Sequence, residues 1–189
     1  MLFLRHLLQL IMAPHTGWAD ISSVDKPVSF WMSKGFYPLL AICSLSCIVS
    51  YFYHPDLSIG ICIQRMLITF IGFYATYYIA GLVFATALNR LVRLPDASDL
   101  TISGAISRFN TMTIFCTGLM MLLTLIGNLM PFELIVTKFL YLYILFIIYR
   151  ASDFIGIEQD RIGLYTLTSF IAVFIPPFCI MEWLSTLLS

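Results

Sequence analysis

Charged side chains are scarce in this chain. Lysine, arginine, aspartate and glutamate make up only 11% of the 189 residues, whereas 60% are hydrophobic, and the mean hydropathy is +0.95. A soluble domain could not hide so much apolar surface, so lipid must be the solvent for most of it. The formal net charge is zero, which argues against nucleic acid as a partner.

The apolar runs also lack the deep ionisable groups that ion transporters and proton relays carry. No carboxylate or histidine falls near the centre of any run. Lys138 comes closest, about one helical turn inside its run, where a long side chain can reach the membrane surface. The sequence therefore gives no support to an ion or proton pathway.

Signatures of metal binding and catalysis are missing as well. Four of the five cysteines lie inside apolar runs, and Cys43 and Cys47 have helical spacing without the histidine or further cysteine that a zinc site needs. We interpret the cysteines as small packing residues. No nucleophile motif is recognisable. We expect a protein that is not an enzyme and has no cofactor and no metal.

What the chain does contain is apolar runs of membrane-spanning length, each needing about 20 residues to cross the bilayer. The runs cover residues 35–53, 66–88, 111–130, 134–149 and 164–181. They predict an all-α fold: a polytopic membrane helical bundle of about five transmembrane helices over residues 35–189. Pro176 and Pro177 should kink the last helix, because proline removes a helical donor.

Residues 1–34 are predicted to form a cytoplasmic interfacial helix and a linker. The first dozen residues have an amphipathic pattern and no small-residue cleavage site, so we expect a retained interfacial helix rather than a signal peptide. Its apolar face consists of Leu4, Leu7, Leu8 and Ile11. Arg5 and Gln9 lie on the polar face.

Small residues recur every fourth position in the second run, at Gly72, Thr76 and Ala80. One side of this helix should therefore admit close helix packing, and we expect it to be central in the bundle. The third run carries the polar residues Thr113, Thr117, Thr124 and Asn128. They either form hydrogen bonds between packed helices or line a polar path for a small molecule or lipid.

The basic residues are distributed unevenly over the two sides that alternating spans would create. Eight fall on the N-terminal side, namely Arg5, Lys26, Lys34, Arg90, Arg93, Arg108, Arg150 and Arg161. Two fall on the other, Arg65 and Lys138. Because basic loops stay in the cytoplasm, the N-terminus is predicted to be cytoplasmic and the C-terminus extracytoplasmic.

The densest charged segment is residues 150–161, between the fourth and fifth runs. One interpretation is a solvated loop that fixes topology through screened ion pairs. The other is a docking surface, for which mixed charges suit a protein partner better than an anionic lipid. The candidate docking residues are Arg90, Arg93, Arg150, Asp153, Glu158, Asp160 and Arg161.

Three segments resemble the Yip family, the Ypt/Rab-interacting membrane proteins. They are LIMAP at 10–14 followed by Trp18 and Ile21, YPLL at 37–40, and YLYIL at 141–145 leading through Arg150 to Arg161. The resemblance implies five spans with a cytoplasmic N-terminus. The N-terminal region is short, and DLSIG at 56–60 stands in place of the Asp-Leu-Tyr-Gly-Pro motif of eukaryotic members. In both respects the chain resembles bacterial-type members, and this resemblance implies a location in the inner membrane.

The leading hypothesis is a non-enzymatic membrane scaffold or adaptor. Its partners would be membrane lipids and a protein at the cytoplasmic face, and homo-oligomerisation stays open. The alternative hypothesis is a small-molecule or lipid permease. A solvated cavity reaching the membrane midplane would favour the permease, and a tightly packed bundle would favour the scaffold.

The charge bias predicts the result of reporter fusions. A reporter active only in the cytoplasm should work when it is fused before Met1 and fail when it is fused after Ser189. Activity in the opposite pattern would contradict the predicted orientation.

Overall fold

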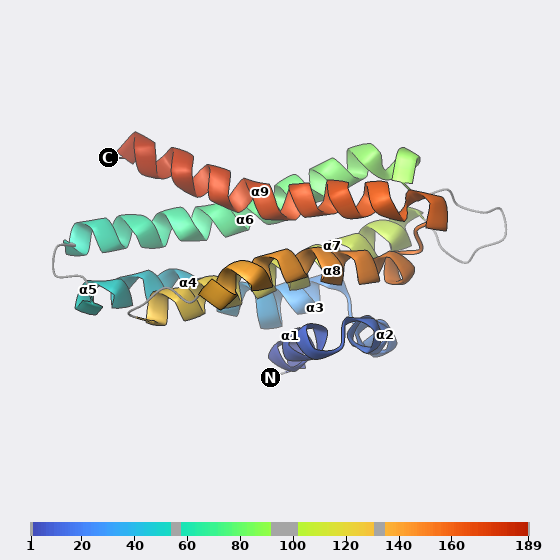
Figure 1. Cartoon of the computed structure of the whole chain (residues 1–189), viewed down its shortest axis with the longest axis horizontal. Coiled ribbons are helices and arrows are strands. Elements are labelled where there is room, and N and C mark those ends of the chain that lie inside the picture. Colours follow the sequence, from blue (N-terminus) through green and yellow to red (C-terminus); the bar gives the residue numbers. More distant parts are fainter. Residues whose placement is uncertain (1, 54–57, 92–101, 131–134, 189) are drawn as a thin grey trace.

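The computed structural model describes residues 2–53, 58–91, 102–130 and 135–188, and these residues are almost entirely helical (Figure 1). Within them no strand occurs, so the predicted all-α fold class is confirmed. The long helices are α4 (Tyr37–Ser46) with the turns flanking it, α6 (Ile59–Leu91), α7 (Ile102–Leu129), α8 (Ile135–Ile155) and α9 (Ile162–Leu188). The shorter ones are α1 (Leu2–Met12), α2 (Pro14–Val24), α3 (Val28–Trp31) and α5 (Ser50–Tyr53).

Among the residues that the structure describes, four helical segments are long and apolar enough to cross a membrane: Val28–Tyr53, Ile59–Ala87, Ser103–Leu129 and Gln159–Leu187. The remaining predicted span, residues 134–149, falls mostly on α8, which packs beside α7 and α9. The side chains at 135–138, including Lys138, lie outside the described residues. The first span begins at Val28 rather than at 35, because the polar residues Ser33 and Lys34 end an apolar run without ending a helix.

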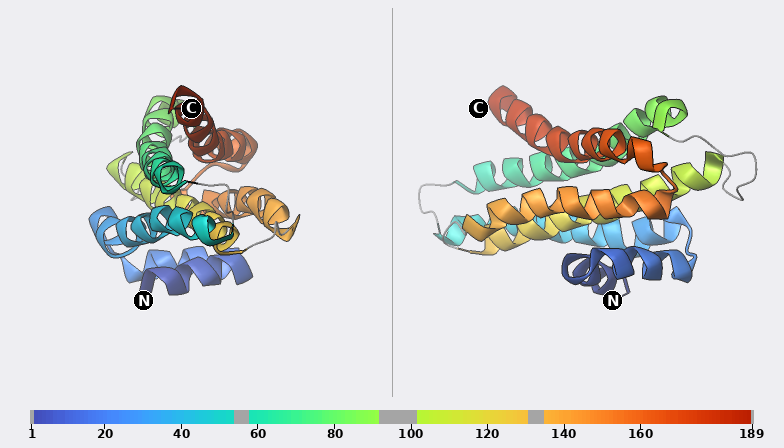
Figure 2. Two further views of the ribbon diagram at one scale, coloured as in Figure 1. Left: turned by 90° about the vertical axis from the view of Figure 1, so that its left-hand side faces the viewer. Right: turned by 45° about the vertical axis from the view of Figure 1, so that its right-hand side comes forward.

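The helices form three layers, with successive long helices running in alternating directions (Figures 1 and 2). Helices α6 and α9 pack against each other and make one layer. The middle layer contains α4, α7 and α8, and the short helices α1 and α2 cover its other side. Helix α9 passes through Pro176 and Pro177, and its C-terminal part angles away from its first part.

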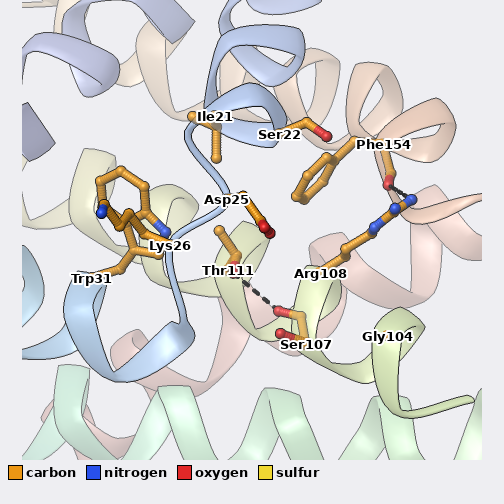
Figure 3. Close-up of a pocket in the computed structure, with 10 residues that line it drawn as sticks. All are labelled: Ile21, Ser22, Asp25, Lys26, Trp31, Gly104, Ser107, Arg108, Thr111 and Phe154. Carbon is orange, nitrogen blue, oxygen red and sulfur yellow. Dashed lines mark hydrogen bonds between the residues drawn. The ribbon is translucent and has the colours of Figure 1, made fainter. Parts of the chain in front are cut away.

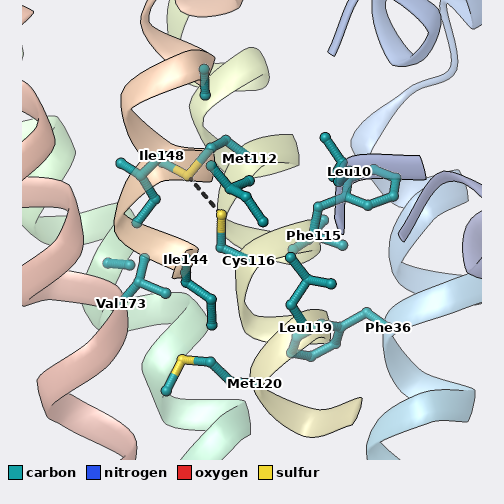
Figure 4. Close-up of a cluster of buried hydrophobic side chains, with 14 of the residues drawn as sticks. Leu10, Phe36, Met112, Phe115, Cys116, Leu119, Met120, Ile144, Ile148 and Val173 are labelled. Carbon is teal, nitrogen blue, oxygen red and sulfur yellow. Dashed lines mark hydrogen bonds between the residues drawn. The ribbon is translucent and has the colours of Figure 1, made fainter. Parts of the chain in front are cut away.

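Helix α7, rather than α6, is the central helix. It contacts α1, α3, α4, α6, α8 and α9, and residues 111–121 are buried without interruption. Figure 4 shows side chains from its neighbours meeting Met112, Cys116 and Met120. The expectation that α6 is central was wrong, because only one side of α6 is packed. The large apolar residues on its other side are exposed, among them Leu67, Phe70, Ile71, Tyr74 and Tyr78.

The small-residue side of α6 lies against α9. A Cβ added at Gly72 would be 2.9 Å from Met181 Cγ and 3.4 Å from the backbone oxygen of Pro177. Thr76 and Ala80, one and two turns further on, are fully buried, and the Thr76 hydroxyl donates a 2.7 Å hydrogen bond to the Gly72 carbonyl. The missing side chain at Gly72 thus sets how closely α6 approaches the proline-containing part of α9.

Replacing Gly72 by leucine should destabilise the bundle. The Met181 side chain can move, but the Pro177 backbone cannot move without separating the helices, so we expect a cost of about 1–3 kcal/mol. Thermal unfolding in detergent would measure it. Gly127→Leu is the matched control, because a Cβ at Gly127 meets nothing within 4 Å. Equal melting temperatures for the two variants would show that Gly72 does not limit the approach of α9.

Candidate functional site

Helices α1 and α2 form a tight hairpin at the N-terminus. Pro14 occupies the first turn of α2, where a missing N–H costs nothing, and Ala13 is the only residue between the helices. The helices approach closely because Gly17 has no side chain: a Cβ there would be 2.9 Å from Leu10 Cδ2. Gln9 also donates a side-chain hydrogen bond to Asp20 across the hairpin. The two helices therefore act as one unit.

One face of α1 is buried against the bundle through Phe3, His6, Leu7 and Leu10. The amphipathic pattern predicts a single apolar face of Leu4, Leu7, Leu8 and Ile11. In the structure Leu7 is completely buried and Ile11 is half-buried, whereas Leu4 and Leu8 are exposed. The reason is that Leu7 lies at the border between two apolar faces, and the protein-facing one includes Phe3 and His6. Whether α1 lies at the membrane interface stays a prediction.

Phe3 fits against two glycines from different helices. Its ring occupies the space that a side chain at Gly35 would need, and its Cζ atom would be 3.2 Å from a Cβ at Gly118. The ring also lies 4.8 Å from the Phe115 ring, centroid to centroid. Gly118 is near the middle of the span Ser103–Leu129. The hairpin thus reaches to the mid-length of the central helix.

Gly35 belongs to a π-helical turn, Met32–Phe36, that interrupts the first span. Pro38 lies two residues after this turn, and a proline ring clashes with the carbonyl four residues earlier while its nitrogen donates no hydrogen bond. A π turn relieves this conflict by shifting the hydrogen bonds before proline to a wider spacing. The same widened turn holds Gly35 beneath the Phe3 ring.

Two hydrogen bonds hold the hairpin to α8. The Trp18 Nε1–H group donates to the Ile147 carbonyl at 3.0 Å, and the Tyr143 hydroxyl donates to the Ile11 carbonyl at 3.0 Å. Each bond replaces the hydrogen bond to water that the donor and acceptor lose when they pack inside the protein. Each therefore fixes the position of the hairpin and adds to its stability.

Arg108 lies where the hairpin meets the first turns of α7 and the last turns of α8. The Phe154 ring stacks on Trp18 at 5.3 Å between centroids, and the Arg108 guanidinium carbon is 5.9 Å from the same ring. Arg108 Nη1 also donates a 3.0 Å hydrogen bond to the Phe154 carbonyl. The guanidinium is thereby held by both the backbone and the ring of one residue.

Two cavities flank this arginine and share Ser22, Arg108 and Phe154 as walls. The first, of about 280 Å³, lies between α2 and α7 and is also lined by Asp25 and Lys26 (Figure 3). The second, of about 230 Å³, lies towards α8 and is lined further by His15, Trp18, Ala19, Arg150 and Asp153. We take this pair of cavities, called the Arg108 cavities below, as the candidate site.

The predicted docking residues separate into two groups. Arg150 and Asp153 line the second of the Arg108 cavities. Glu158, Asp160 and Arg161 instead form a short turn in which Arg161 Nε lies 3.8 Å from Glu158 Oε2 and 4.0 Å from Asp160 Oδ2. The side chain of Arg90 and the whole of Arg93 lie outside the described residues.

Sequence reasoning missed the part of the site contributed by the hairpin. Trp18, Ser22 and Asp25 follow one another at the spacing of a single helix face, and that pattern could have indicated a face turned towards another element. The pairing of this face with Arg108 was not readable, because about 80 residues separate Asp25 from Arg108 and no sequence pattern links them.

His6 is buried at the hairpin interface, with 4% of its surface exposed, and its ring meets the Trp31 ring edge-on at 5.8 Å. Neither ring nitrogen forms a hydrogen bond within the described residues. Burial, and to a smaller extent the neighbouring Arg5 charge, lowers the pKa of His6 below its ordinary value of 6.5, while Asp20 opposes the shift. Docking of the hairpin therefore favours the neutral form of His6.

A scan of known protein-family models, a search of curated proteins and a search of solved structures each found no match to this chain.

Docking of the hairpin should weaken in acid. His6 has a lower pKa in the docked state than in the open state, so the open state binds protons more readily as the pH falls below about 6.5. Amide hydrogen exchange in α1, corrected for the intrinsic rate, should rise between pH 8 and pH 5. His6→Phe should remove this rise, whereas His15→Phe should keep it because His15 is exposed. An unchanged rise in His6→Phe would contradict this role.

Proposed function

We propose that the protein is a non-enzymatic membrane scaffold or adaptor that meets a protein partner at one end of the bundle. That end is where α7 begins and α8 ends, and the distribution of basic residues assigns it to the cytoplasm. The observation that carries the proposal is the unbroken burial of residues 111–121 in α7. A central helix surrounded by side chains suits a rigid support better than a conduction path.

The polar residues of α7 support the same conclusion, because most of them are occupied within the bundle. The Thr113 hydroxyl donates to the Phe109 carbonyl at 3.0 Å, and the Thr124 hydroxyl donates to the Met120 carbonyl at 2.9 Å. Such bonds satisfy a hydroxyl inside a single helix. These two threonines need neither water nor a substrate to complete their hydrogen bonding.

Asn128 links α7 to the first span. Its Nδ2 group donates to Ser46 Oγ at 2.9 Å and lies 3.5 Å from Cys47 Sγ. Cys47 Sγ in turn lies 3.4 Å from the Thr69 hydroxyl of α6. Asn128 and Cys47 together therefore connect α7, the first span and α6, which is the packing role that polar side chains have between membrane helices.

The turn Glu158–Arg161 offers the partner an accessible mixed-charge surface. The Asp160 side chain is 71% exposed, and the contacts that Asp160 and Glu158 each make with Arg161 are long and solvent-screened. Because the turn is held mainly by backbone and by its connection to α9, its charges are available to a complementary protein. This is the kind of function that the resemblance to the Yip family implies, with a cytoplasmic N-terminus and, for a bacterial-type member, an inner-membrane location.

A small-molecule or lipid permease is the second candidate, and one observation favours it. Four buried hydroxyls form no hydrogen bond within the described residues: Thr117 on α7 and Tyr165, Thr166 and Ser169 on α9. Unpartnered hydroxyls inside a bundle are typical of places that bind water or a polar solute. Labelling of a Thr117→Cys variant by a water-soluble thiol reagent, in a background lacking the native cysteines, would favour the permease; complete protection would favour the scaffold.

Reversing the charge of the turn should separate docking from folding. We expect Glu158→Lys combined with Asp160→Lys to release the protein partner that copurifies with the native chain. The melting temperature should barely change, because exposed charges contribute less than about 0.5 kcal/mol. Quantitative recovery of the partner from crosslinked membranes would measure the loss.

Glu182→Lys is the control, since it reverses an exposed carboxylate near the opposite end of α9. It should retain the partner. Equal recovery from the turn variant and the control would overturn docking at this turn, and so would unfolding of the turn variant.

A further inference from the structure

The Arg108 cavities hold charges of both signs. Lys26, Arg108 and Arg150 contribute three positive charges, and Asp25 and Asp153 contribute two negative charges, which leaves an excess of one. Both cavities are far larger than the roughly 15 Å³ that one water molecule requires. A purely anionic ligand would meet two carboxylates. A ligand with a phosphate and an amine would match both kinds of group.

The two arginines are positioned to bind a phosphate. Arg108 uses one of its five N–H donors on the Phe154 carbonyl and borders both cavities. Arg150 lies with its guanidinium carbon 5.2 Å from the Phe146 ring centroid and 5.9 Å from that of Tyr149. Neither arginine forms an ion pair with another residue that the structure describes. Their fixed, planar donors are the groups that proteins use for phosphate.

The surface beside the second cavity indicates where the ligand comes from. Along α8, exposed apolar residues follow one another at helical spacing up to Arg150 and Asp153; they are Phe139, Leu142, Phe146 and Tyr149. An apolar strip that ends in a charged cavity has the same order of polarity as a phospholipid, with acyl chains along the strip and the headgroup in the cavity. A soluble phosphate compound would have no use for the strip.

We propose that the second of the Arg108 cavities binds the headgroup of a phosphoethanolamine lipid from the adjacent leaflet, with Arg108 and Arg150 on its phosphate and Asp153 on its ammonium group. The bound lipid would join α2, α7 and α8, which are the elements that line the second cavity. This site is separate from the exposed turn Glu158–Arg161 that the proposed function uses, so each can fail without the other.

The test uses the full chain purified in detergent, with lipid retention measured by native mass spectrometry and binding measured by the thermal shift on titration with each lipid. Phosphatidylethanolamine should remain bound and stabilise the protein. Phosphatidylcholine should bind more weakly, because its quaternary amine has no hydrogen to donate to Asp153. Inorganic phosphate and free phosphoethanolamine separate a lipid site from a soluble phosphate site, since neither should match the shift given by the lipid.

Arg150→Gln should weaken phosphatidylethanolamine binding about tenfold or more, which is the loss expected for one charge-assisted hydrogen bond. Arg65→Gln is the matched control, because Arg65 is an exposed arginine near the start of α6, at the opposite end of the bundle. Asp153→Asn should shift preference from phosphatidylethanolamine towards phosphatidylglycerol, a change that simple loss of stability would not produce.

Three results would overturn the proposal. They are equal binding of phosphatidylcholine and phosphatidylethanolamine, protection by free phosphoethanolamine as strong as that by the lipid, and equal retention by Arg150→Gln and Arg65→Gln. None of these measurements depends on a protein partner. Failure here therefore leaves the adaptor hypothesis standing, and failure of the adaptor test leaves the lipid site standing.

Discussion

The complete enclosure of α7 is the constraint on which the other contacts depend. A helix buried over residues 111–121 must meet protein on every side, and two layers of long helices leave one side open. The N-terminal hairpin fills that side. In lipid, helix association gains little from the hydrophobic effect and relies on close packing and hydrogen bonds. The hairpin supplies both: Phe3 packs closely against Gly35 and Gly118, and the Trp18 indole N–H donates a hydrogen bond to the Ile147 carbonyl.

This arrangement explains why the candidate site lies where it does. Trp18 brings α2 against the end of α8, and Phe154 then lies between Trp18 and Arg108. The arginine is held at the junction, and the spaces on its two sides become the Arg108 cavities. The charged surface of the protein is therefore partly a product of how the hairpin docks, since the walls of both cavities include residues of α2 or the segment just after it.

The fold class followed from the sequence because apolar run length alone reports helices in a membrane. The close contact of Gly72 with α9 also agrees with a local pattern of small residues. The sequence did not reveal which helix is central. Apolar side chains suit contact with lipid as well as contact with protein, so the composition of α6 does not show which of its sides is packed. The candidate site could not be predicted for another reason. Ser22 and Arg108 come together only through tertiary packing, and no pattern in the sequence links two residues so far apart. The adaptor function and the Yip resemblance stay predictions.

The separation between the hairpin and its partners has a consequence for synthesis. Trp18 is 129 residues from Ile147, and Ile11 is 132 residues from Tyr143. At about 5–20 residues per second, the ribosome needs on the order of ten seconds to make the chain between them. The hairpin is thus made well before its partners on α8, and during that interval its apolar faces must be sheltered by lipid or by the insertion machinery. The contacts between the hairpin and α8 can form only after α8 has entered the membrane.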